Sequence, residues 1–252
     1  MVKFERLIDF DRQLLDWIVE KDTGHSKECI LSAVNHLKMA YKIKDIDPEI
    51  ALFRCITAEE EVARAIFLKL REQGYKNTNK NKIKDKDHKY KQALDLFLGT
   101  IQNHFVSYQE HNSNFPKEIQ LILNENKKLL EVGLLIENVF MKSIPPLNFS
   151  FKVNNEPYYF KKELQELVEL NSKQILKQIE EKANFRNKII YAETKGILKF
   201  NEPIDAELDR YYKIVFRLIR IYCLIYPYKN EKSDFLQNAI DAYVFMMNEM
   251  EM

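Results

Sequence analysis

The chain has 252 residues and a mass of 30.1 kDa, enough for one large domain or two small ones with a substantial hydrophobic core. Its 39 lysines and arginines nearly balance its 38 aspartates and glutamates, which excludes a strongly basic nucleic-acid-binding domain but leaves room for a local basic patch. Only five glycines occur, and their positions exclude the glycine-rich phosphate-binding motifs GxxxxGK and GxGxxG.

The cysteines and the apolar stretches indicate a protein of the cytoplasm. Cys29, Cys55 and Cys223 are odd in number, widely spaced and without a CxxC, so neither a disulfide framework nor a zinc site is predicted. We expect no cofactor and no bound metal. Acidic residues interrupt every apolar run near the N-terminus, and the most apolar stretch, 215–226, contains two arginines and is too short to span a bilayer. The prediction is therefore a cytoplasmic protein without membrane association.

Apolar residues recur at helical spacing along most of the chain. The clearest start is at Pro48, where Asp47 can cap the helix, and Gly74 provides a natural stop. The lysine-rich segment 76–87 is predicted to be a flexible, solvated loop. A second cap is expected at Ser26. The predicted helices span about 4–20, 26–43, 48–74, 88–110, 116–143, 161–196, 204–226 and 233–250.

One segment, 147–160, breaks this pattern. Aromatic and β-branched residues flank the turn-prone pair Asn154-Asn155, which predicts a short β-hairpin. The fold class predicted for residues 1–252 is a single all-α domain, a bundle of about seven to eight helices with this one hairpin insertion.

An arginine interrupts an apolar stripe of the long helix that begins near residue 161. Val168, Ile175, Ile179 and Ile190 share one helical face, and Arg186 lies on the same face. A guanidinium group directed into an apolar face is costly unless it is paired. Arg186 is therefore predicted to have a carboxylate partner or a ligand.

The helix from Pro48 offers two carboxylates on its apolar faces. Glu60 interrupts one apolar stripe and Glu59 the neighbouring one, whereas Glu61 shares a polar face with two arginines. We predict that Glu60, or Glu59, contacts Arg186 where the two long helices meet. Two interpretations stay open: a structural ion pair in the core, and a functional site between helices.

The same residues carry a resemblance to a known family. The segment 186–191, Arg-Asn-Lys-Ile-Ile-Tyr, resembles the Arg-containing signature of HEPN (higher eukaryotes and prokaryotes nucleotide-binding) domains, with Tyr191 where the family has histidine. The segment 57–65 resembles the acidic helix of HEPN proteins of the abortive-infection type. The resemblance implies an all-α bundle, frequent homodimers, metal-independent RNA cleavage, and a role as a toxin or in phage defence.

Two functional hypotheses follow. In the first, which the resemblance implies, the protein acts on RNA as a ribonuclease or an RNA-binding protein, either in defence or with an antitoxin. Arg186 would stabilise charge on the scissile phosphate, Asn187 would position that phosphate, Tyr191 would donate a hydrogen bond or proton, and Glu60 would orient Arg186. In the second, the protein is a non-catalytic helical subunit that binds a protein partner or senses a ligand, and the pair of Arg186 and Glu60 is structural.

Overall fold

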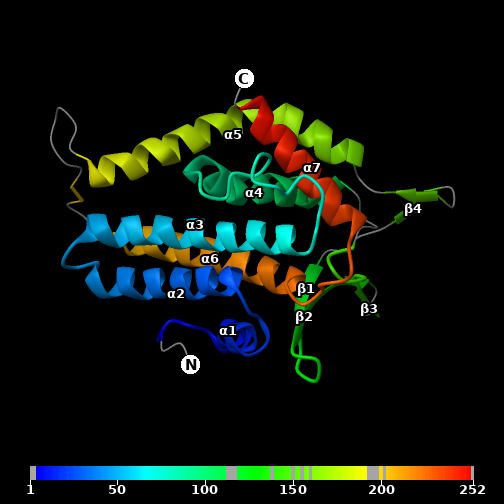
Figure 1. The fold of residues 1–252 in the computed structure, drawn as a ribbon, viewed down its shortest axis with the longest axis horizontal. Coiled ribbons are helices and arrows are strands. Elements are labelled where there is room, and N and C mark those ends of the chain that lie inside the picture. The colour runs from blue at the N-terminus through cyan, green and yellow to red at the C-terminus, as the bar shows by residue number, and fades with distance from the viewer. Residues whose placement is uncertain are drawn as a thin grey trace.

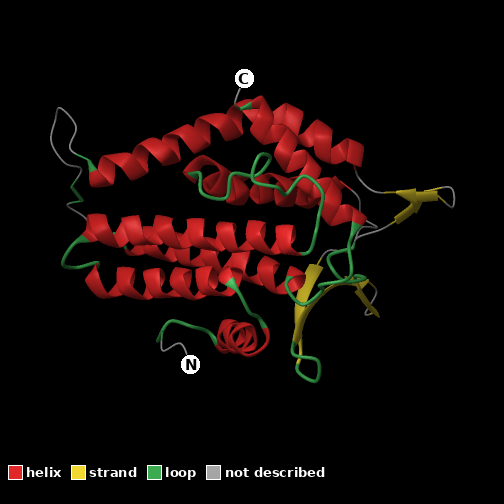
Figure 2. Ribbon diagram, viewed as in Figure 1, coloured by secondary structure: helices red, strands yellow, loops and turns green. Residues whose placement is uncertain are grey.

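The computed structural model describes residues 4–111, 118–136, 139–148, 151–153, 156–158, 161–191, 199–200 and 203–250. Seven helices and two small antiparallel sheets make up these residues (Figures 1 and 2). The helices are α1 (Asp9–Lys21), α2 (His25–Ile43), α3 (Pro48–Glu72), α4 (His88–His111), α5 (Lys161–Ile190), α6 (Asp205–Ile225) and α7 (Asp234–Glu249). The predicted mostly α-helical fold is confirmed.

Helix α3 lies at the centre of the bundle. It packs against α2 and α6 on one side and against α4 and α5 on the other, while α7 covers α4 and α5 (Figure 1). Alanines with no exposed surface, at Ala58, Ala63 and Ala65, allow neighbouring helices to approach it closely. Because almost every face of α3 is covered, any charged side chain on its inner turns must find a partner inside the protein.

The predicted ends of α3 are confirmed. The side chain of Asp47 accepts a hydrogen bond from the backbone N–H of Ile50 at 2.9 Å, and Pro48 is the first helical residue. Gly74 lies just past the helix with a φ of 73°, in the left-handed region that favours glycine. The cap predicted at Ser26 is wrong: α2 begins at His25, after Gly24, and the side chain of Ser26 is buried in its first turn.

The helix predicted at 116–143 is also wrong. Its described residues form an antiparallel sheet of β1 (Glu118–Asn124), β2 (Leu129–Ile136) and β3 (Val139–Lys142). Leu130 and Val132, two residues apart on β2, are both buried, as the alternation of a strand requires, and β2 packs against α6. Because this segment contains so many apolar residues, its sequence fits both the helical and the strand periodicity. Packing against α6 favours the strand.

The hairpin predicted within 147–160 is confirmed in its described part. Strands β4 (Phe151–Val153) and β5 (Glu156–Tyr158) pair antiparallel, with Val153 opposite Glu156. The predicted turn residues, Asn154 and Asn155, lie outside the described residues.

The lysine-rich segment 76–87 forms a loop of turns with internal anchors. The Arg71 side chain donates hydrogen bonds to the carbonyls of Thr78 and Ile83 and contacts the Asp85 carboxylate at 3.0 Å. Ile83 is buried in the core. These contacts fix the position at which α4 begins, beside α3. None of the helices in the described ranges is both long and apolar enough to cross a lipid bilayer.

Candidate functional site

Two cations, rather than one, interrupt the apolar stripe of α5. The stripe continues through Ile189, which is buried, whereas Ile190 is exposed, so the predicted membership of Ile190 is wrong. The side chains that α5 turns towards the core at this end are Ile175, Ile179, Lys182, Arg186 and Ile189, at alternating spacings of four and three residues. Lys182 therefore joins Arg186 as a charged group facing α3.

The predicted ion pair between the two long helices is confirmed, with Glu60 as the partner. Arg186 Nε lies 3.6 Å from Glu60 Oε1, and the guanidinium group stacks over the Phe53 ring at 5.0 Å from its centre. The Arg186 side chain is only 18% exposed. One aromatic ring and one carboxylate, both from α3, therefore fix the position of the arginine.

The Glu60 carboxylate also binds three side chains from the start of α4. His88 Nδ1 lies 2.6 Å from Oε2, Lys91 Nζ lies 3.2 Å from the same oxygen, and Gln92 Nε2 donates to Oε1 at 3.0 Å. Only 3% of the Glu60 side chain is exposed. One buried carboxylate thus holds groups from two other helices in place.

A second carboxylate pair continues the site towards α6. Glu59 Oε1 accepts a hydrogen bond from Lys182 Nζ at 2.9 Å, and Lys182 also lies 4.0 Å from Asp95 Oδ2. Asp95 in turn binds Arg217 of α6. Burial raises the pKa of the Glu59 carboxyl group, and the charge of Lys182 opposes this shift without overcoming it.

These contacts join four helices in what we call the ionic cluster: Glu59, Glu60, His88, Lys91, Asp95, Lys182, Arg186 and Arg217. Three carboxylates face four permanent cations, so the cluster carries positive charge before His88 is counted. Within the described ranges, no three His, Cys, Asp or Glu side chains converge as they would to hold a metal ion. The cluster is instead suited to an anionic ligand.

His88 is the cluster member best placed to meet a ligand, because 47% of its side chain is exposed while its carboxylate partner is buried. Nδ1 faces Glu60, and Nε2 has no partner among the residues that the structure describes. A carboxylate that binds one imidazole nitrogen fixes the orientation of the ring and so fixes where the other nitrogen lies. Glu60, His88 and Arg186 together offer a proton acceptor beside a fixed guanidinium group.

The two remaining predicted site residues lie on the outer surface. Asn187 is exposed, and its backbone carbonyl accepts a hydrogen bond from Tyr191 N at 2.8 Å. The Tyr191 side chain is 64% exposed at the end of α5. Neither side chain contacts the ionic cluster in the part of the chain that the structure describes.

No protein-family model, curated protein or solved structure matches this chain.

Sequence reasoning missed His88, Lys91 and Asp95 because the lysine-rich composition before them indicated only a solvated loop. A signal was nevertheless present: His88, Lys91, Gln92 and Asp95 are spaced at i, i+3, i+4 and i+7, which places them on one helical face. Four polar residues on one face opposite the two glutamates of α3 are the pattern of a buried polar network.

Replacing Glu59 with glutamine is expected to change the free energy of unfolding at neutral pH by less than about 1 kcal/mol, since Lys182 keeps the Asp95 carboxylate at 4.0 Å. The pKa of Glu59 is raised in the folded state, so its contribution to stability is present below its ordinary value of 4.5 and is lost as pH rises through the folded value. Urea denaturation at pH values from 4.5 upwards should show that the free energy of unfolding of wild type falls relative to that of Glu59→Gln. Parallel curves would contradict the raised pKa.

Proposed function

We propose that this protein binds single-stranded RNA at the ionic cluster and cleaves it without a metal ion, as an HEPN-like helical protein. The observation that supports this is the single Glu60 carboxylate that holds both Arg186 and His88. A guanidinium group binds phosphate oxygens and offsets the charge that develops during cleavage. An imidazole with a free nitrogen can accept the proton of a ribose 2′-hydroxyl group.

In the proposed reaction, His88 Nε2 takes the proton of the 2′-hydroxyl group while the 2′ oxygen attacks the adjacent phosphorus atom. The bond from phosphorus to the 5′ oxygen breaks, and that oxygen takes a proton from water. The products are a 2′,3′-cyclic phosphate and a 5′-hydroxyl end. Arg186 holds the phosphate, and Asn187 and Tyr191, on the adjoining exposed face of α5, donate hydrogen bonds to the RNA backbone.

The resemblance to HEPN proteins of the abortive-infection type supports a biological setting for this reaction. We propose that the protein acts on cellular RNA as a defence protein or as a toxin restrained by an antitoxin, and that it works as a homodimer. Expression of wild type should then slow growth, whereas expression of Arg186→Ala should not.

One observation favours a second candidate function. Arg186 is largely buried and already bound by Glu60, which is also how a structural ion pair is built. In this alternative the protein is a non-catalytic helical subunit that binds a protein partner, and the ionic cluster fixes the packing of α3, α4 and α5. RNA incubated with this protein would then remain intact, and Arg186→Ala would change only the stability of the fold.

The deciding experiment is cleavage of single-stranded RNA by purified protein in the presence of a chelator. Wild type should give products with 2′,3′-cyclic phosphate ends, and Arg186→Ala should cleave about 10²-fold more slowly, as expected for loss of one preorganised charge. Lys177→Ala removes an exposed positive charge from the same helix and should cleave at the wild-type rate. Intact RNA with wild type would instead support the partner-binding subunit.

A further inference from the structure

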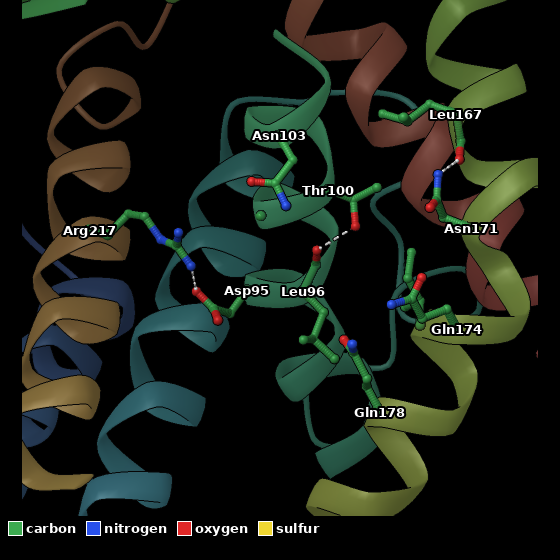
Figure 3. Close-up of a pocket in the computed structure, with 11 residues that line it drawn as sticks. Asp95, Leu96, Thr100, Asn103, Leu167, Asn171, Gln174, Gln178 and Arg217 are labelled. Carbon is green, nitrogen blue, oxygen red and sulfur yellow. Dashed lines mark hydrogen bonds and ion pairs between the residues drawn. The ribbon is translucent and has the colours of Figure 1, made fainter. Parts of the chain in front are cut away.

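A polar pocket of about 420 Å³ lies against α4, between α5 and α6. Gly99, Thr100 and Asn103 line it from α4, and Gln174 and Gln178 reach towards it from α5 (Figure 3). Its size falls within the range of about 300–1,000 Å³ that is usual for small-molecule sites. The pocket adjoins the ionic cluster, because Asp95 and Arg217 belong to both.

The lining of the pocket offers neutral hydrogen-bonding groups. Asn103, Gln174 and Gln178 each carry an amide with both donor and acceptor atoms. Within the residues that the structure describes, these three amides have no hydrogen-bond partner. Asn171, by contrast, donates to the carbonyl of Leu167 at 2.7 Å. Asn103 and Gln174 are exposed and Gln178 is half-buried, so the three amides face the open side of the pocket, where a ligand can reach them.

The other residues that line the pocket indicate the polarity and charge of the ligand. Leu96, Leu167 and Ile175 supply apolar surface beside the amides. The one carboxylate, Asp95, is matched by Arg217 and Lys182, so the pocket has no unpaired charge to attract an ion. The ligand should therefore be neutral, with apolar faces that pack on the leucine and isoleucine side chains and a polar edge that hydrogen-bonds to the amides. Nucleobases are planar groups of this kind.

We propose that this pocket binds one unstacked nucleobase of RNA, and that it selects the nucleotide beside which the ionic cluster acts. The proposal rests on the proposed RNA cleavage for its role, although binding itself can be measured separately. Side-chain amides of asparagine and glutamine pair with base edges through two hydrogen bonds at once, which distinguishes one base from another. The shared Asp95 places the base pocket next to the groups that would bind the phosphate.

Gly99 allows the pocket to be filled without disturbing the fold. A Cβ atom built on Gly99 meets no atom within 4 Å, and its backbone is helical, so Gly99→Leu places a side chain in the open space of the pocket. Leucine also favours a helix more than glycine does. Gln174→Leu removes one of the free amides, and Gln165→Leu is the matched control, because Gln165 is an exposed residue of α5 outside the pocket.

The test is a titration of the full-length protein with each of the four ribonucleosides, in which NMR detects binding. Inorganic phosphate serves as a separate probe of the ionic cluster. At least one nucleoside should bind in the millimolar range. Binding should weaken about tenfold or more in Gly99→Leu and Gln174→Leu, the size expected for one lost amide contact, and should be unchanged in Gln165→Leu. Phosphate binding should be the same in all four proteins.

Three results would overturn the base pocket. The first two are no nucleoside binding at millimolar concentration and equal binding by wild type and Gly99→Leu. RNA cleavage by wild type with an unchanged nucleotide preference in Gly99→Leu would also overturn it, while leaving the proposed cleavage intact. Nucleoside binding by a wild-type protein that leaves RNA uncut would support the pocket and contradict the proposed cleavage. The two proposals can therefore fail independently.

Discussion

Replacing Glu60 with alanine is expected to lower the free energy of unfolding by about 3–5 kcal/mol, the size found when one partner of a buried ion pair is removed. The Glu60 carboxylate is buried, and Lys91, with 7% of its side chain exposed, has no other carboxylate partner among the residues that the structure describes. Its charge would remain inside the protein without compensation. Urea denaturation of the two proteins at neutral pH measures the difference.

Glu61→Ala is the matched control for Glu60→Ala. Glu61 is the next residue of α3, its side chain is 20% exposed against 3% for Glu60, and its ion pair with Arg64 is long, at 4.0 Å. Its removal should cost less than about 1 kcal/mol. In a double-mutant cycle, Arg186→Ala should destabilise Glu60→Ala less than it destabilises wild type, since the two residues share one contact. Additive losses would show that the Glu60 contact with Arg186 is not an energetic pair.

The pair of Glu60 and Arg186 could be predicted from sequence because both residues interrupt apolar stripes on long helices. Burying a charge is costly enough that such an interruption carries information even without a structure. The sequence could not decide which of two adjacent glutamates meets Arg186, because consecutive residues are 100° apart on a helix and the relative rotation of α3 and α5 depends on packing. The structure assigns Glu60 to Arg186 and Glu59 to Lys182.

The sequence predicts α4 at about 88–110, close to its observed range, but not the contact of its first turn with Glu60, because the lysine-rich composition before it indicates a solvated loop. The lysines before His88 are typical of a solvated loop, yet Ile83 and Arg71 anchor that loop and so direct the first turn of α4 towards Glu60. These tertiary contacts, which the local sequence does not reveal, position that turn beside α3. The anchored loop before α4 therefore brings His88 into contact with Glu60.

The largest error in the fold prediction has a comparable cause. Residues 118–142 contain so many apolar side chains that a helical face and a strand face can both be drawn through them. The turn that separates β1 from β2 includes Lys128 at a φ of 52°, a conformation that no local preference of lysine predicts. Packing of β2 against α6 supplies the energy that the local sequence does not reveal.

The second large effect is expected for His88. Replacing it with glutamine should lower the rate of RNA cleavage by about 10²–10⁴-fold, the usual contribution of a general base. Glutamine can still hydrogen-bond to Glu60 but cannot accept a proton from the ribose. Because His88 is half-exposed and Glu60 keeps Lys91, Gln92 and Arg186, folding stability and the Kd for uncut RNA should change little.

A comparison of His88 with Tyr191 shows which of the two residues moves the proton in the proposed cleavage. Tyr191→Phe removes one hydrogen-bond donor at an exposed position and should slow cleavage by no more than about fivefold, the equivalent of roughly 1 kcal/mol. If Tyr191→Phe abolishes cleavage while His88→Gln retains it, Tyr191 is the catalytic group and His88 only positions Glu60.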